Sequence, residues 1–279
     1  MARRDAEARV VLVTGCSAGG IGHHLALELA QHGCRVYASA RDPAKMQVLS
    51  ELGIQTVALD VIDDESVRRA VAHVEGEAGR IDILVNNAAV MCVGPAVELG
   101  LDRLSAALET NVVGVTRVCS AVAPAMIARR SGLIVNVGSV SGYATTPWVG
   151  YYAASKAAVH TLSDAMRMEL APFNVRVVVL APGGIKSNIA ANNPHTELPD
   201  NSPFQPAAAA IRARAELSQT GNATPTDQFV RVIVPRILAP EPAPYISYGN
   251  HATSIWLLSF TPPFVRDWLF GRRFGTSAL

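Results

Sequence analysis

Val10-Val11-Leu12-Val13-Thr14-Gly15-Cys16-Ser17-Ala18-Gly19-Gly20-Ile21-Gly22 decides the fold of this chain. The stretch opens on four aliphatic residues, which are typical of a strand buried on both faces. A glycine-rich turn follows, and then a helical pattern from about Gly22 to His32, which Gly33 ends. Glycines permit the tight turn and let backbone amides approach a pyrophosphate at the positive end of a helix. This order predicts a dinucleotide-binding unit rather than a flexible surface turn.

The alternation of apolar runs with helical patterns continues to about residue 185. Further strands are predicted at 35–38, 56–59, 81–85, 132–137 and 175–180, and amphipathic helices at 63–78, 102–129 and 150–171. Continuous apolar strands between helices indicate a parallel sheet covered on both faces. Right-handed crossovers then give an α/β fold, a Rossmann-type doubly wound parallel sheet, and we expect residues 1–279 to form one domain.

Composition excludes several classes of protein. Of the 279 residues, 49% are hydrophobic and 17% are charged, so the chain buries a core and is not disordered. The net charge of +1 is dispersed, which argues against nucleic acid as a partner. The four cysteines lie far apart and the histidines lack ligand spacing, so we expect reduced thiols and no metal site. The polar start has no signal peptide and no spanning helix is evident, which predicts a cytoplasmic protein.

Two residues in Tyr152-Ala153-Ala154-Ser155-Lys156 form the strongest candidate for chemistry. A spacing of four places the phenol and the ammonium on one face of the predicted helix. We expect the ammonium to lower the pKa of the tyrosine, so that the phenol can hand a proton to a carbonyl oxygen. Ser139 lies 13 positions upstream of the tyrosine, and Ser141 is its neighbouring rival.

The end of the second predicted strand indicates which dinucleotide is bound. A carboxylate there would hold a ribose 2′-hydroxyl, but the chain has Ala40 followed by Arg41. An arginine without an acid favours the 2′-phosphate of NADPH, the alternative being a solvated surface arginine. Asp60 follows the third strand, where it either accepts from the adenine amino group or caps the next helix.

These residues together resemble the short-chain dehydrogenase/reductase family over about residues 9–187. The motifs that carry the resemblance are Thr14-Gly15 with Gly20-Ile21-Gly22, Asn86-Asn87-Ala88, Asn111 in Asn-Val-Val-Gly, Ser139 in Gly-Ser-Val-Ser-Gly, Tyr152 with Lys156, and Pro182-Gly183. The extended turn, 172–177, 183–185 and the apolar C-terminus are similar to fungal NADPH-dependent 1-acyldihydroxyacetone-phosphate reductases and to reductases of fungal secondary metabolism.

The resemblance implies a role for each matching residue. Tyr152 is the general acid in reduction, Lys156 tunes it and binds the nicotinamide ribose, Ser139 holds the substrate oxygen, and Asn111 fixes a water that relays protons. The implied cofactor is NADPH/NADP+. The implied cofactor-binding residues are Gly15, Ser17, Gly20, Ile21, Gly22, Arg41, Asp60, Val61, Asn87, Tyr152, Lys156, Pro182, Gly183 and Ile185.

The chain departs from the family pattern at two places. Four residues separate Gly15 from Gly20, where three are usual. Ala89 stands where the family has a glycine, so we expect Ala89 to adopt a backbone conformation usually given to glycine.

The last third of the chain is less regular. Residues 188–228 are rich in Asn, Pro and Ala, with one helical stretch near 206–219, and are predicted to be a substrate lid rather than a mere surface excursion. Residues 250–279 form an apolar extension that carries two of the three tryptophans and several arginines. The extension is a pocket wall, a dimer contact or a peripheral membrane or lipid contact.

The resemblance implies an oxidoreductase that reduces a ketone of an apolar small molecule to an alcohol. The substrate would be an acylated glycerone phosphate or a fungal secondary-metabolite intermediate, and a phosphate would need basic residues such as Lys186, Arg212 or Arg214. The alternatives are a redox-neutral epimerase or cyclase and a non-catalytic cofactor-binding scaffold. The family also implies a homo-oligomer that uses the helices at 102–129 and 150–171.

Overall fold

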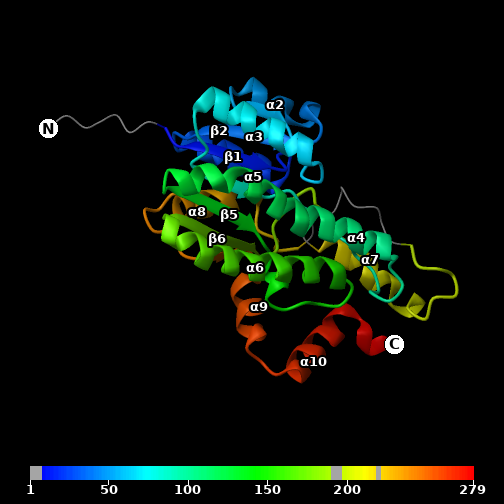
Figure 1. Cartoon of the computed structure of the whole chain (residues 1–279). Helices are drawn as coiled ribbons and strands as arrows, with labels where there is room; N and C mark the ends of the chain where they lie inside the picture. The colour runs from blue at the N-terminus through cyan, green and yellow to red at the C-terminus, as the bar shows by residue number, and fades with distance from the viewer. Residues whose placement is uncertain (1–7, 190–196, 218–220) are drawn as a thin grey trace.

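The computed structural model describes residues 8–189, 197–217 and 221–279 (Figure 1). In this part of the chain seven parallel strands form one sheet in the order β3-β2-β1-β4-β5-β6-β7. The predicted doubly wound sheet is therefore confirmed, because the strand order reverses between β1 and β4. The strands are β1 (Val10–Thr14), β2 (Arg35–Ala40), β3 (Gln55–Ala58), β4 (Ile83–Asn86), β5 (Gly132–Val137), β6 (Val175–Pro182) and β7 (Tyr245–Tyr248).

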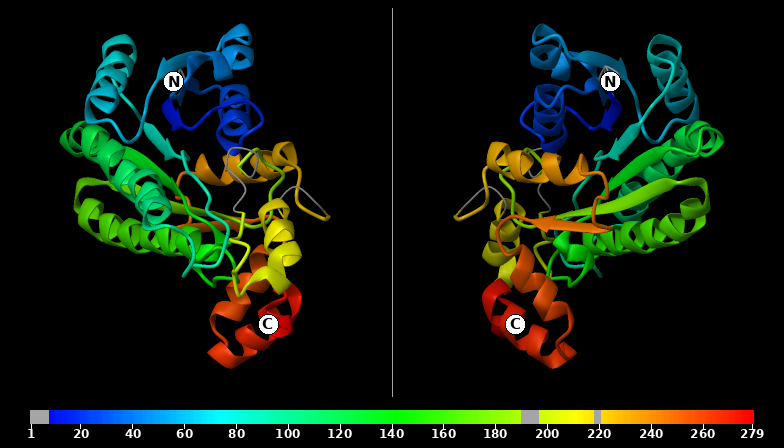
Figure 2. Two further views of the ribbon diagram at one scale, coloured as in Figure 1. Left: turned by 90° about the vertical axis from the view of Figure 1, so that its right-hand side faces the viewer. Right: turned by 90° about the vertical axis from the view of Figure 1, so that its left-hand side faces the viewer.

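Helices cover both faces of the sheet. Figure 2 shows α1 (blue) and α8 (orange) on one side and the green helices α5 and α6 on the other. Short helical turns complete the connections. The elements are α1 (Ile21–Gln31), η1 (Pro43–Met46), α2 (Gln47–Glu51), α3 (Asp64–Ala78), α4 (Leu101–Leu108), η2 (Glu109–Val113), α5 (Gly114–Ala128), η3 (Val140–Gly142), α6 (Gly150–Leu170), η4 (Ala171–Phe173), η5 (Gln205–Ala207), α7 (Ala208–Glu216), α8 (Thr226–Ile237), α9 (Ala252–Ser259), α10 (Pro263–Phe274) and η6 (Thr276–Ala278).

The first strand shows how the sequence fills both layers of the core. Successive side chains of a strand point to opposite faces. Val11 and Val13 therefore join the cluster beneath α1 and α8, whereas Val10 and Leu12 join the cluster beneath α3, α5 and α6. All four are at least 96% buried, which explains why the strand reads as an unbroken apolar run.

The predicted helix at 102–129 is present but is not uniform. A π-helical turn, η2, interrupts it between α4 and α5. Within Leu101–Ala128 an 18-residue window has a mean hydropathy of 1.4, and the segment is long enough to cross a membrane, which the sequence prediction had excluded. Val118, Val122 and Met126 are fully buried against the sheet, so the segment packs as a core helix.

A strand and a helix next to the predicted lid were among the elements that were not predicted. Strand β7 extends the sheet beyond β6, and α8 lies where the lid was expected to end. Helix α7 does fall within the predicted helical stretch at 206–219. The lid prediction also covers residues 190–196 and 218–220, which lie outside the described residues.

The C-terminal extension folds into α9 and α10, which pack beside α7 (Figures 1 and 2). A C-terminal cluster, made of Trp148, Ala207, Ile211, Phe270 and Phe274, joins these helices to the loop before α6. The indole nitrogen of Trp148 donates to the carbonyl of Phe274 at 2.8 Å. The extension is thus a wall beside the loop that leads to Tyr152.

Gly15, in the turn after β1, is required both for its backbone conformation and for close packing, and alanine substitutions can separate the two effects on stability. Gly15 has φ +74°, and an added Cβ would lie 2.7 Å from the Cα of Ala88. Gly33 has φ +78° but open space around it. We expect Gly33→Ala to cost about 1–2 kcal/mol from left-handed strain alone. Gly15→Ala should cost clearly more, because backbone atoms must also move. Urea denaturation of both variants measures the difference, and equal losses would contradict the packing argument.

Candidate active site

Hydrogen bonds from Thr14 and Asn87 hold the glycine turn against the end of β4. The Thr14 hydroxyl accepts from the backbone N–H groups of Asn87 and Ala88 at 3.0 and 3.1 Å. The Asn87 amide donates to the carbonyls of Thr14 and Gly15 at 2.9 and 3.0 Å. Both protons of that amide nitrogen are therefore used by the protein, so Asn87 shapes the turn that it was predicted to complete as a cofactor-binding residue.

The start of α1 suits an anionic ligand. Gly20 occupies the cap position and offers no side chain to the first turn of the helix. The unpaired N–H groups of a helix start attract phosphate groups, and the absence of a Cβ leaves room for them. Ala18 N–H donates to the carbonyl of Lys45 at 2.9 Å, which joins the turn, one residue longer than usual, to η1.

A cleft of about 300 Å³ runs along the carboxyl ends of β1 to β4. This volume is at the lower end for ligand pockets. The predicted residues Gly15, Ser17, Gly20, Ile21, Arg41, Asp60, Val61 and Asn87 line it together. Gly22 does not line the cleft and is buried within α1, where an added Cβ would lie 2.6 Å from the carbonyl oxygen of Gly15. Lining residues that were not predicted include Lys45, Leu59, Ile62, Val90, Thr110 and residues 187–189.

The cleft is basic where β2 ends. Arg41 and Lys45 are exposed and line it beside Ala40. Asp42 follows Arg41 in the sequence, and its carboxylate accepts from the Ala44 N–H at 3.0 Å and so caps η1. Lys45 was missed because its approach depends on the turn of η1, which brings it back toward the strand end.

Asp60 and Val61 form the next part of the wall. The Asp60 carboxylate accepts from the Ile62 N–H at 3.2 Å. The alternative that Asp60 caps the following helix is wrong, because Asp63 caps α3 by accepting from the Glu65 N–H. The carbonyl of Val61 accepts from Arg117 at 2.7 Å, which ties this wall to α5.

The candidate catalytic side chains meet at the carboxyl end of β5. Ser139 caps the start of η3, and its hydroxyl is near enough to the Tyr152 phenol on α6 to lower the pKa of that phenol. The same hydroxyl accepts from the Ser141 N–H at 3.1 Å, so Ser141 supports Ser139 through its backbone. The structure therefore favours Ser139 over Ser141 as the partner of the tyrosine.

The electrostatics of the pair differ from the sequence prediction. The Lys156 ammonium lies 5.8 Å from the centre of the Tyr152 ring and donates to the Val137 carbonyl at 2.7 Å. Burial lowers the pKa of Lys156 to about 8. Burial also raises the pKa of Tyr152, opposed in part by the Ser139 hydrogen bond and the charge of Arg214. The predicted lowering of the Tyr152 pKa is therefore wrong, because desolvation of the phenol outweighs its neighbours. A protonated phenol is what a general acid needs.

Asn111 lies in the π-helical turn η2 and is fully buried. Its amide oxygen accepts from the Val90 N–H at 2.8 Å, and its amide nitrogen donates to the Val90 carbonyl and to the Ser155 hydroxyl, both at 2.9 Å. The side chain thus joins the loop after β4 to the catalytic helix. Both of its amide protons are used by the protein, so the predicted water would be held by the remaining lone pair of the amide oxygen or by the backbone.

A buried polar ladder that the sequence did not reveal sets the position of α6. Asn86 donates to Asn136 across adjacent strands at 2.9 Å, and Asn136 donates to the Ser163 hydroxyl at 2.9 Å. His160, one turn after Lys156, accepts from the Ser139 N–H at 3.3 Å. The spacing Tyr152, Lys156, His160 places all three on one helical face and was the available signal.

Pro182, Gly183 and Ile185 follow β6. Gly183 packs so closely on the chain after β7 that an added Cβ would lie 2.2 Å from the Asn250 carbonyl oxygen. The Ile185 side chain belongs to the hydrophobic core, which leaves its backbone as the part that can meet a cofactor. Ala89 corrects a second expectation. It is not among the non-glycine residues with positive φ in the described part of the chain, so it needs no glycine-like conformation.

The described residues hold no group of three or more His, Cys, Asp or Glu side chains that could bind a metal ion. The four cysteines are free thiols, and burial raises the pKa of Cys16 and of Cys119 to about 12.

Residues 9–198 match the family model described as short chain dehydrogenase. An NADPH-dependent 1-acyldihydroxyacetone phosphate reductase of Schizosaccharomyces pombe is 39% identical over 203 residues, covering 71% of this chain and 68% of the relative. A short-chain dehydrogenase of Hypocrea virens is 32% identical over 273 residues, covering 96% and 93%.

Solved structures agree. A short-chain dehydrogenase from Streptomyces avermitilis is 26% identical with a TM-score of 0.81, and the match covers 98% of each chain. A gluconate 5-dehydrogenase from Burkholderia cenocepacia, in complex with NADP and tartrate, is 27% identical with a TM-score of 0.70, covering 89% of this chain and 96% of that one.

The fold and the cleft define an oxidoreductase that binds a nicotinamide dinucleotide. The chain belongs to the short-chain dehydrogenase/reductase family. The predicted family, class of enzyme and type of cofactor are confirmed, and the scaffold alternative is not supported.

His160 makes a pH-dependent contribution to stability. Burial, then the charge of Lys156, lowers the pKa of His160 to about 4, below its usual value of 6.5. Between these values the unfolded chain binds the extra proton, so stability falls as pH falls from 6.5 toward 4, by about 1.4 kcal/mol per pH unit.

Urea denaturation of the wild-type protein and of His160→Gln across this pH range measures the effect. The variant should lack this part of the slope. The exposed His73 on α3 provides the control His73→Gln, which should keep it. Identical slopes for the wild-type protein and His160→Gln would contradict a buried neutral imidazole.

Proposed function

We propose that this chain is an NADPH-dependent reductase that converts the ketone of an apolar substrate to an alcohol. The observation that carries the proposal is the meeting of Ser139, a protonated Tyr152 and Lys156 at the carboxyl end of β5, with Tyr152 and Lys156 on the same face of α6. The proposal concerns the direction of reaction, the choice of NADPH and the class of substrate.

The residues divide the chemistry among them. The Ser139 hydroxyl donates to the carbonyl oxygen and holds it in place. The Tyr152 phenol gives its proton to that oxygen as negative charge develops on it. Lys156 stabilises the phenolate left behind, and Asn111 keeps α6 aligned with the loop after β4. A bound NADPH would supply the hydride.

Charge at the end of β2 supports NADPH rather than NADH. Arg41 and Lys45 line the cleft, and the carboxylate of Asp42 is engaged by the backbone of η1. Guanidinium and ammonium groups suit a ribose 2′-phosphate. The S. pombe relative is named for its use of NADPH, which agrees with this choice.

The C-terminal cluster supports an apolar substrate. It packs against the loop that precedes Tyr152, and the aromatic residues Trp148 and Phe204 meet edge to face with ring centres 5.9 Å apart. Asn188 donates to the Ala18 carbonyl at 2.8 Å, which anchors the start of the lid segment on the glycine turn. Together the lid segment and the extension would enclose the substrate. The predicted oligomer surface and the predicted membrane contact stay predictions.

Removing the phenol hydroxyl tests the reaction. Tyr152→Phe should bind NADPH normally but reduce apolar ketones at least about 100-fold more slowly, because general acid catalysis contributes at least that much. Absorbance at the NADPH band, with chromatography of the alcohol, measures turnover. The neighbouring Tyr151→Phe is the control and should keep most of the activity. Conversion of the substrate without net NADPH consumption would instead indicate a redox-neutral enzyme. Near-normal turnover by Tyr152→Phe would exclude Tyr152 as the general acid.

Removing cations at the end of β2 tests the choice of cofactor. Arg41→Ala should weaken NADPH binding by about 1.5 kcal/mol, the low end for a charge-assisted hydrogen bond, because the side chain is exposed. Adding Lys45→Ala should weaken it further, whereas NADH binding should hardly change. Calorimetry with both cofactors measures the losses, and Arg35→Ala, at the start of the same strand, is the control. Equal losses for NADPH and NADH would contradict recognition of the 2′-phosphate.

A further inference from the structure

Arg214 is a cation that the chemistry described so far does not use. It lies on α7, three residues after Ile211, and Ile211 is buried in the C-terminal cluster. Residues three apart share a helical side, so packing of α7 against the cluster carries Arg214 toward the loop before α6. Arg212 lies on the same helix but is exposed.

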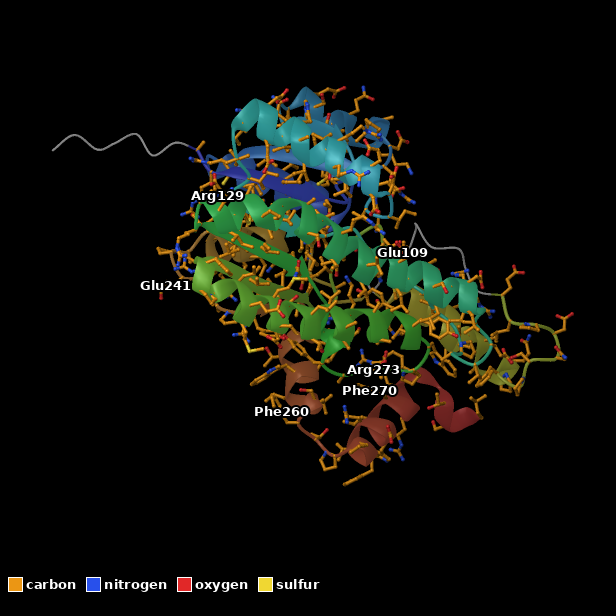
Figure 3. All side chains as sticks on the ribbon, in the orientation of Figure 1. Glu109, Arg129, Glu241, Phe260, Phe270 and Arg273 are labelled. Atoms are coloured by element: carbon orange, nitrogen blue, oxygen red, sulfur yellow. The ribbon has the colours of Figure 1, made fainter. Side chains whose placement is uncertain are left out.

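Two contacts hold the guanidinium in place. Its Nε donates to the hydroxyl of Thr146 at 3.1 Å, and Thr146 lies in the loop that leads to Tyr152. Its carbon lies 5.6 Å from the centre of the Phe274 ring, so the end of α10 supports one face. Three segments that are distant in the sequence therefore fix one side chain. Figure 2 shows α7 (yellow) beside the C-terminal helices (orange and red), and Figure 3 shows Phe270 on the side of α10 that faces the body of the protein.

The guanidinium forms no ion pair with a carboxylate among the residues that the structure describes. The internal segments 190–196 and 218–220 contain no Asp or Glu. Arg214 is partly buried, and burial lowers the pKa of its guanidinium to about 10. The bond to Thr146 uses only the Nε–H group. The N–H groups of the two terminal nitrogens stay available, and their planar arrangement matches the oxygens of a carboxylate or a phosphate.

The hydrogen bond to Thr146 ties Arg214 to the loop that leads to Tyr152. The charge of Arg214 lowers the pKa of Tyr152, although burial raises it overall. An anionic group bound to the terminal nitrogens would therefore lie close to the carbonyl that receives the phenol's proton. The apolar side chains of the C-terminal cluster flank the same place and would contact the remainder of the molecule.

We propose that Arg214 is a specificity-determining residue that binds an anionic oxygen group, a carboxylate or a phosphate ester, next to the reacting ketone of an otherwise apolar substrate. The inference rests on the proposed function, because it names the substrate class of the same site. An uncharged ketone would leave the guanidinium without a counter-ion, so the site selects against it.

Paired ketones test this selection. One pair is a medium-chain γ-keto acid and its methyl ester, and the other is acylated dihydroxyacetone phosphate and acylated dihydroxyacetone. Steady-state rates with NADPH are compared for the wild-type protein, Arg214→Gln, Arg214→Lys and the control Arg212→Gln. For at least one anionic ketone, kcat/KM should fall about 10- to 100-fold in Arg214→Gln, the usual range for a lost charged hydrogen bond. The neutral partner should change less than about twofold, Arg214→Lys should recover part of the loss, and Arg212→Gln should resemble the wild-type protein.

The pairs also distinguish the two anions. The loss of kcat/KM should fall on the keto acid if the site binds a carboxylate, and on acylated dihydroxyacetone phosphate if it binds a phosphate ester. Equal losses for charged and neutral ketones would overturn the proposal. They would show that Arg214 acts on the Tyr152 phenol alone, which a shifted pH profile would confirm, or that it only supports the loop. No loss in either pair would overturn it as well.

A binding measurement separates this inference from the proposed function. Protein saturated with NADP+ has no hydride to give, so calorimetric titration with the same four ketones reports binding alone. The anionic ketone should bind about 10- to 100-fold more weakly to Arg214→Gln, and its neutral partner should bind equally to both proteins. A wild-type protein that reduces no ketone would count against the proposed function only, while the calorimetric difference still decides the role of Arg214. Binding without any charge-dependent difference would overturn that role.

Discussion

The junction between Thr14 and Asn87 is the constraint on which the site depends. β1 and β4 are neighbours in the sheet, and the strand order reverses between them, so the loops after these strands part and leave a crevice. Four hydrogen bonds that involve the side chains of Thr14 and Asn87 fix the geometry of the crevice. Gly15 makes this approach feasible, since its missing Cβ lets the turn contact Ala88 directly. These contacts fix the turn before α1, while the apolar core holds the body of α1 through Leu25 and Leu29.

Burial determines the protonation of the catalytic pair. In water, a lysine beside a tyrosine would favour phenolate and ammonium. Here desolvation disfavours both charged forms, raising the pKa of Tyr152 and lowering that of Lys156 to about 8. The phenol is therefore neutral before the reaction. When it gives up its proton, the phenolate that forms is stabilised by Lys156 and Ser139. The polar ladder from Asn86 to Ser163 and the bond from His160 to Ser139 give this buried site its fixed geometry.

Local pattern was sufficient for the first six strands and for choosing candidate catalytic residues that the structure brings together. The apolar run at Val10–Thr14 and the spacing of Tyr152 and Lys156 depend on neighbours in the sequence, so they could be recognised directly. β7 has four residues and depends on pairing with β6, which no local signal reveals. The π-helical turn at Asn111 and the sign of the Tyr152 pKa shift arise from tertiary packing. Lys45 reaches the cleft only because of the turn of η1.

The two halves of the site follow different rules. The dinucleotide half is built from one continuous βαβ unit, so a few glycines suffice to specify it. The proposed substrate half joins α7, the loop at Thr146 and the end of α10, and Thr146 and Phe274 are 128 residues apart in the sequence. No local motif can encode such a site, because each segment contributes a single contact. A family that keeps one cofactor and changes its substrates would vary these outer segments, since altering them leaves the hydrogen bonds at Thr14 and Asn87 untouched. Arg214, the residue proposed to select the substrate, lies among these outer segments. Its partly buried guanidinium is positioned by tertiary contacts with Thr146 and Phe274 and not by its neighbours in the sequence.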